Sequence, residues 1–111
     1  MIHLCLFKTI VEIGELLDFY GVLLTGRQRE YMELYYNENL TLAEIAGHFG
    51  ISRQAVHDTM GHAEEQLRAY EAKLQLFQKQ MERMKLAEEI LQRLPQEDRD
   101  WLGPMLTRIT E

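Results

Sequence analysis

The chain has 111 residues, about the size of one domain, and 46% of them are hydrophobic, which excludes disordered, collagen-like and low-complexity classes. Eighteen acidic and twelve basic side chains give a net charge of -6, which argues against a protein that coats nucleic acid or an anionic membrane by charge alone. Because the single cysteine, Cys5, cannot form an internal disulfide, we expect a cytoplasmic protein.

Apolar residues follow helical spacing along almost the whole chain, and no period-two strand pattern persists, so we expect an all-α fold. The apolar residues 1–7 lack a small-residue cleavage pattern, so they are expected to be the start of a helix or a short extension rather than an export signal. The first predicted helix covers about residues 8–24. Thr25 and Gln28 have the spacing of a capping box and begin a second helix, which ends near residues 37–39.

The centre of the chain predicts two helices joined by a short turn. Thr41 and Glu44 repeat the capping-box spacing and begin a third helix, residues 41–49. Gly50 ends this helix, and Ser52 caps a fourth helix after a break of two residues.

The fourth helix is predicted to be long, because no proline or cluster of turn residues follows until Pro95; a break near residues 84–87 stays open. Its apolar residues repeat at alternating spacings of three and four, which is typical of a helix that packs along another helix. We name this pattern the heptad seam; its members are Met60, Ala63, Leu67, Tyr70, Leu74, Phe77, Met81 and Met84. A short final helix over residues 97–109 is expected to be interrupted at Gly103-Pro104.

Residues 42–56 carry the most specific motif. In a helix-turn-helix the two helices cross closely, the turn needs a residue that tolerates positive φ, and a β-branched side chain fills the space between the helices. Ala46, Gly50 and Val56 meet these three needs at spacings of four and six, and Ile45 and Ile51 flank them. The sequence therefore predicts a helix-turn-helix.

With residues 24–36, this motif resembles region 4 of bacterial sigma factors, and residues 17–76 more closely resemble the YlxM family of small helix-turn-helix proteins. The stretches that carry the YlxM resemblance are Asp18-Phe19-Tyr20, Leu23-Leu24-Thr25, Glu33-Leu34-Tyr35-Tyr36, Leu42-Ala43-Glu44-Ile45-Ala46, Ser52-Arg53-Gln54-Ala55-Val56 and Tyr70-Glu71-Ala72-Lys73-Leu74. The resemblance implies an all-helical cytoplasmic protein linked to the signal recognition particle, whose GTPase and RNA deliver nascent membrane proteins. Gly61 and His62 stand where members of the family usually carry a basic pair.

The first turns of the fourth helix are the candidate nucleic-acid site. If this helix enters a major groove, Arg53 has the geometry to read guanine and Gln54 to read adenine. The alternative is that Ser52 only caps the helix and that its neighbours are solvated. Residues 25–70 contain four arginines and seven acidic residues, a net charge of -3, so we expect weak binding to nucleic acid at physiological salt. The candidate residues are Ser52, Arg53, Gln54, His57 and Asp58.

No pattern typical of an enzyme, a metal site or a cofactor site is found, so none of the three is expected. His57 and His62 are five residues apart, which places them on different faces of a helix, unlike the i, i+4 pair that metal sites use. Cys5 is interpreted as a small buried hydrophobe. Adjacent carboxylates, at residues 64–65 and 88–89, point apart and are interpreted as solvated charges.

Two units and two functions are predicted. Residues 1–66 are expected to hold the first helix and the helix-turn-helix, and residues 67–111 the extension of the long helix and a C-terminal segment packed with the rest as one domain. Four residues of the heptad seam are expected to contact this segment or a second copy of the chain: Leu67, Tyr70, Leu74 and Phe77. We expect a homodimer, and we expect no insertion into a membrane.

The first functional hypothesis is a non-catalytic regulator or adaptor that binds signal recognition particle components or DNA. The alternative is a DNA-binding transcriptional regulator with a recognition helix like that of sigma region 4.

Overall fold

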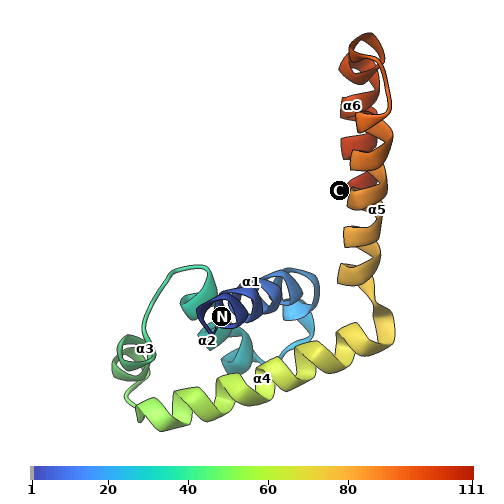
Figure 1. Cartoon of the computed structure of the whole chain (residues 1–111). Coiled ribbons are helices and arrows are strands. Elements are labelled where there is room, and N and C mark those ends of the chain that lie inside the picture. Colours follow the sequence, from blue (N-terminus) through green and yellow to red (C-terminus); the bar gives the residue numbers. More distant parts are fainter. Residues whose placement is uncertain (1) are drawn as a thin grey trace. The chain divides into compact units, whose positions relative to one another are not determined.

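The computed structural model describes the backbone of residues 2–111 and the side chains of residues 10–111, so the expectation for the Cys5 side chain lies outside the described part. The elements are α1 (Ile2–Tyr20), a 3₁₀ turn η1 (Gly21–Leu23), α2 (Gly26–Tyr36), α3 (Leu42–Phe49), α4 (Arg53–Leu74), α5 (Leu76–Gln92) and α6 (Gln96–Thr110) (Figure 1). Every regular element of the described backbone is helical, which confirms the all-α fold. The chain divides into an N-terminal unit, which ends at Leu74, and a C-terminal hairpin, which begins at Gln75.

The N-terminal unit is built on α4, which contacts α1, α2 and α3 (Figure 1). Its core combines the inner faces of all four helices, and burying each large aliphatic side chain contributes roughly 1.5–3 kcal/mol. The buried residues are Ile13, Leu16, Leu17, Tyr20, Leu24, Tyr31, Met32, Ile45, Ala46, Val56, Met60, Ala63 and Leu67.

The predicted capping residues occupy the helix starts. The Gln28 side-chain oxygen accepts a hydrogen bond from the Thr25 amide at 3.3 Å. At the start of α3, the Thr41 hydroxyl accepts from the Glu44 amide at 3.1 Å, and the Glu44 carboxylate accepts from the Thr41 amide at 3.1 Å. Both capping boxes are therefore confirmed.

The turn between α3 and α4 is that of a helix-turn-helix. Gly50 ends α3 in the left-handed region, with φ 67°, and the Ile51 amide donates to the Ala46 carbonyl at 3.1 Å. The Ser52 hydroxyl then accepts from the Ala55 amide at 3.0 Å, which caps α4. Ile45, Ala46 and Val56 are buried next to this turn, as predicted. Ile51 is exposed, so its expected place in the packing of the motif is wrong.

Two helices differ from the prediction in their boundaries. The first helix begins at Ile2, and its last turn tightens into η1 after Tyr20. The long helix ends at Leu74, far before Pro95, because Gln75 adopts a left-handed conformation with φ 55°. The heptad seam therefore does not lie on one continuous helix.

In the C-terminal hairpin, α5 and α6 contact each other. Arg99 holds the turn between them, because its guanidinium donates to the carbonyls of Leu94 at 3.0 Å and Gln92 at 3.2 Å. The expected interruption of the final helix is wrong: α6 continues through Pro104. Gly103 has no Cβ to clash with the proline ring, and its carbonyl accepts from the Thr107 hydroxyl at 3.0 Å.

None of the helices in the described part is long and apolar enough to cross a membrane.

Candidate functional site

The predicted recognition residues lie together at the start of α4, and all five are exposed: Ser52, Arg53, Gln54, His57 and Asp58. Val56 and Met60, from the same turns, are buried against the other helices of the N-terminal unit. Since the buried and exposed residues alternate with helical spacing, one face of α4 is anchored and the opposite face is presented to the outside.

Most polar groups of this face are already engaged within α4. The Ser52 hydroxyl oxygen serves as the cap, and the Gln54 side-chain amide donates to the Asp58 carboxylate at 2.8 Å. The His57 Nδ1 atom lies 3.7 Å from the same carboxylate. Arg53 forms no ion pair with any described residue, so it is the free cation of the first turn.

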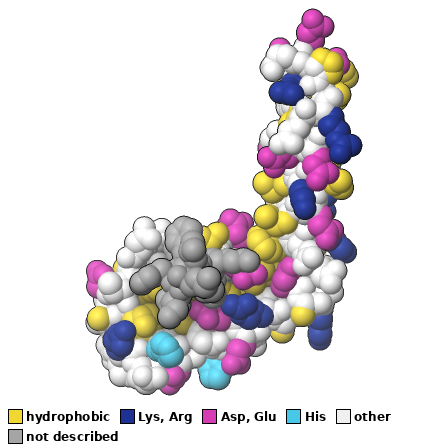
Figure 2. Space-filling model, in the orientation of Figure 1, with side chains coloured by type: hydrophobic (Ala, Val, Ile, Leu, Met, Phe, Trp, Pro, Cys, Tyr) yellow, Lys and Arg dark blue, Asp and Glu magenta, His cyan; other side chains and the backbone are white. Residues whose placement is uncertain are grey.

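The helix-turn-helix module, residues 25–70, is acidic as a whole. Of the four arginines in residues 25–70, Arg27 pairs with Glu30 at 3.3 Å and Arg29 with Glu33 at 2.9 Å. These exposed pairs add little stability, but each places a carboxylate beside a cation. On the side of the N-terminal unit drawn in Figure 2, histidine and acidic side chains follow each other along the lower edge. In addition to the net charge of -3, two of the four arginines are therefore already paired with a carboxylate.

An aromatic cluster behind the motif was not anticipated from the sequence. The Arg27 guanidinium lies 4.8 Å from the centre of the Phe49 ring, a cation–π distance. The rings of Tyr31 and His48 each approach Phe49 edge-on at 4.9 Å. This cluster joins the start of α2 to the end of α3, and so helps to hold the helix-turn-helix in position.

Two tyrosine–carboxylate hydrogen bonds position α4 against the first two helices. The hydroxyl of the buried Tyr20 donates to Glu71 at 2.7 Å, and the hydroxyl of Tyr36 donates to Glu64 at 3.2 Å. Burial, and secondly the neighbouring Glu64 carboxylate, raise the pKa of Tyr36 well above its usual value. Glu64 therefore accepts a structural hydrogen bond, and the interpretation of residues 64–65 as a solvated pair is wrong for Glu64.

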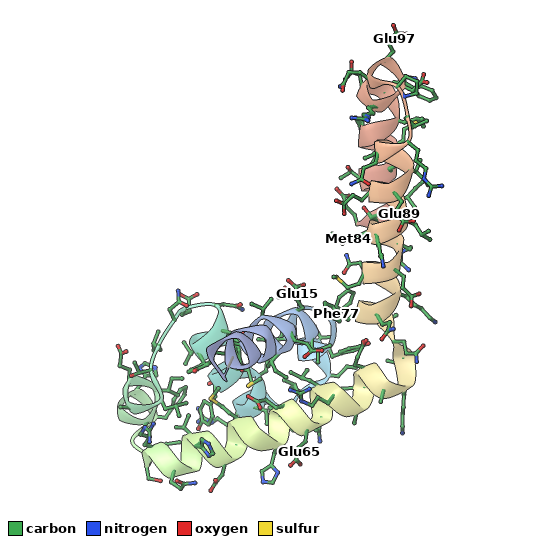
Figure 3. All side chains as sticks on the ribbon, viewed as in Figure 1. Glu15, Glu65, Phe77, Met84, Glu89 and Glu97 are labelled. Carbon is green, nitrogen blue, oxygen red and sulfur yellow. The ribbon has the colours of Figure 1, made fainter. Side chains whose placement is uncertain are left out.

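His57 and His62 form no metal centre with the described residues around them. His57, Asp58, Gly61, His62 and Glu65 line a shallow open hollow along α4, and the labelled Glu65 points away from the other helices (Figure 3). The His62 Nδ1 atom lies 3.9 Å from the Glu65 carboxylate. No group of three potential metal ligands occurs among the described residues.

The four predicted contact residues of the seam do not lie on one helix. Leu67 is fully buried inside the N-terminal unit, and the ring of Tyr70 lies 5.9 Å from that of Tyr20. Leu74, the last residue of α4, is 47% exposed, and Phe77 (labelled in Figure 3) belongs to α5. The expectation that these residues share one face of a continuous helix is wrong.

Comparison with known proteins agrees with this architecture. The family model of UPF0122, described as "Putative helix-turn-helix protein, YlxM / p13 like", matches residues 7–101. A UPF0122 protein of Bacillus mycoides is 49% identical over 93 residues, which cover 84% of each chain. A UPF0122 protein of Clostridium botulinum is 45% identical over 96 residues, 83% of this chain and 88% of the relative. A UPF0122 protein of Streptococcus pneumoniae is 45% identical over 87 residues, which cover 78% of this chain and 79% of the relative.

The description of this family names a helix-turn-helix and no enzymatic activity. The matched region contains α2, α3 and α4 in full, and with them the whole recognition face described above. The chain therefore belongs to the UPF0122 family of YlxM-like helix-turn-helix proteins.

Proposed function

We propose that this chain is a non-catalytic regulatory or adaptor protein of the cytoplasm, whose helix-turn-helix unit binds a protein partner in the signal recognition particle pathway. The observation that carries the proposal is the acidic recognition module, in which Arg27 and Arg29 are each paired with a carboxylate. Nucleic-acid affinity comes largely from neutralised phosphates, and this face offers few free cations. A basic protein surface is the complementary partner.

The resemblance to the YlxM family implies the signal recognition particle pathway. The net charge of the module then favours one component of that pathway as the direct partner. Both the GTPase and the RNA of the signal recognition particle are implied partners. An RNA is a polyanion that a module of net charge -3 repels. We therefore propose the GTPase as the direct partner.

The second candidate is a DNA-binding transcriptional regulator. It is favoured by the exposed first turn of α4, where Arg53 forms no ion pair within the described part of the chain and has the fork geometry that reads guanine. His57 is exposed beside it. In this alternative α4 binds DNA as the recognition helix of sigma region 4 does, and the acidic residues of the module limit its affinity for DNA.

A binding experiment separates the two candidates. The chain is titrated against the purified GTPase, its RNA and a mixed-sequence DNA duplex at about 50 mM and about 150 mM salt. We expect saturable binding to the GTPase and none to either nucleic acid. Failure to bind the GTPase at both salt concentrations would contradict the proposal.

A matched pair of variants decides whether any DNA binding is specific. Arg53→Ala should weaken a genuine DNA complex by about 1–3 kcal/mol, whereas Arg68→Ala, an exposed arginine further along α4, should change it little. Binding to the duplex at about 50 mM salt that only Arg53→Ala removes would establish the regulator and overturn the adaptor.

We also propose a homodimer, which is supported by large apolar side chains that are exposed, such as Leu74 and Met84. Light scattering at tens of micromolar protein should report twice the mass of one chain. A mass of one chain would contradict the dimer and would leave the adaptor role untouched.

A further inference from the structure

The C-terminal hairpin has no core of its own. None of its residues, 75–111, is buried, although α5 and α6 contact each other along their lengths. A segment of fewer than about 40 residues does not usually bury enough apolar surface to be stable without a further partner. The apolar surface of the hairpin must therefore meet something outside the hairpin.

The clearest apolar surface is a stripe on α6. Trp101, Met105 and Ile109 are spaced by four and so follow one line along the helix, about 12 Å long. They are 58%, 55% and 66% exposed. The indole nitrogen of Trp101 donates to the Asp98 carboxylate at 3.2 Å, so its polar edge is satisfied and its ring is free to pack against apolar atoms.

We propose that this α6 stripe is a dimer contact and that its occupant is the same stripe of a second copy, packed antiparallel about a twofold axis at Met105. This arrangement places Met105 against Met105 of the second copy and Trp101 against Ile109 of the second copy. The equal spacing on both sides of Met105 makes the stripe complementary to itself, as a twofold contact requires. The inference rests on the homodimer proposed above and names its surface; it does not depend on what the helix-turn-helix binds.

The charges of α6 favour the antiparallel arrangement. Glu97 and Asp98 lie in its first turn, and Arg108 lies in its last turn. Antiparallel packing brings Glu97 and Asp98 of each α6 towards Arg108 of the other and opposes the two helix dipoles. A parallel pair would instead bring like charges together.

The net charge of the hairpin also permits a second copy. Residues 75–111 contain six basic and seven acidic side chains, a net charge of -1, whereas residues 1–74 contain six basic and eleven acidic, a net charge of -5. Two copies of the hairpin therefore repel each other little, and two copies of the N-terminal unit repel each other more. This difference favours self-association through the hairpin.

The test compares two added carboxylates on the same helix in the full chain. Met105→Glu places a charge in the proposed contact of both copies and should raise the dimer dissociation constant at least about a hundredfold, as measured by sedimentation equilibrium. Thr107→Glu, about 200° round the helix from Met105 and also exposed, should leave the dimer intact. A dimer that survives Met105→Glu, or that Thr107→Glu weakens equally, would overturn the stripe as the contact and leave the homodimer standing.

Cysteine cross-linking tests whether the two α6 helices pack antiparallel. Unlike the Met105→Glu test, it introduces no charge into the dimer contact. In a Cys5→Ser background, a mixture of Trp101→Cys and Ile109→Cys chains should oxidise to a disulfide between the two different chains. Each variant alone should stay uncross-linked. Cross-linking of Trp101→Cys with itself, or no cross-link in the mixture, would overturn the antiparallel stripe.

Discussion

Two glycines of the helix-turn-helix segment, Gly47 and Gly50, allow the role of the turn to be measured without a change in packing. A Cβ added at Gly47 or at Gly50 would meet no atom within 4 Å. Gly47 lies inside α3, whereas Gly50 has a φ of +67°. A left-handed conformation costs a non-glycine residue about 1–2 kcal/mol, and glycine inside a helix costs up to about 1 kcal/mol relative to alanine. Gly50→Ala should therefore destabilise the N-terminal unit, and Gly47→Ala should stabilise it.

Urea unfolding measures whether each of the two substitutions stabilises or destabilises the N-terminal unit. All five tyrosines lie in residues 1–74 and the single tryptophan lies in residues 75–111, so the near-ultraviolet tyrosine signal reports on the N-terminal unit. With a slope of about 2 kcal/mol per M, a change of 1 kcal/mol shifts the midpoint by about 0.5 M. Gly50→Ala should lower the midpoint and Gly47→Ala should raise it. If both variants shift it in the same direction, or if Gly50→Ala leaves it unchanged, the backbone argument for the turn is refuted.

Three further predictions concern the N-terminal unit. Ala46→Leu should destabilise it by about 1–3 kcal/mol through overpacking at the helix crossing, while Ala43→Leu, at an exposed position of α3, should be nearly neutral; equal urea midpoints for the two variants would contradict the placement of Ala46. Leu67→Ala should cost about 2–5 kcal/mol because Leu67 is fully buried, against less than about 1 kcal/mol for Leu74→Ala, again by urea midpoints. The raised pKa of Tyr36 means that above its usual value of 10 the unfolded chain loses this proton before the folded chain does, so stability falls as the pH rises beyond 10. Tyr36→Phe should reduce that fall between about pH 9 and about pH 11, and an unchanged fall would exclude Tyr36 as its source.

Features that depend on neighbours within a few residues were readable from the sequence. The capping boxes at Thr25 and Thr41 need only a residue three positions further on. The left-handed turn at Gly50 needs only a residue without a Cβ. Their combination with Ala46 and Val56 was sufficient to predict the helix-turn-helix, and the family comparison agrees with it.

The break at Gln75 and the continuity of α6 were not readable. Glutamine rarely adopts positive φ, so nothing in the local sequence marks residue 75 as the end of a helix. Pro104 is the reverse case, because its local preference is to interrupt a helix, yet α6 is supported by contacts with α5. At Pro104 the surroundings therefore outweigh the local propensity.

The sequence by itself determined which segments are helical, where most of them begin, and that α3 and α4 form a helix-turn-helix. These properties follow from helical periodicity and from backbone hydrogen bonds that span four residues or fewer. The tertiary structure alone decided that Tyr20 reaches Glu71, that Leu67 is used inside the N-terminal unit, and that the exposed apolar surface of the hairpin includes a stripe on α6. The physical reason is that a contact between residues 51 positions apart depends on how whole helices pack, and that packing leaves no periodic signal in the sequence.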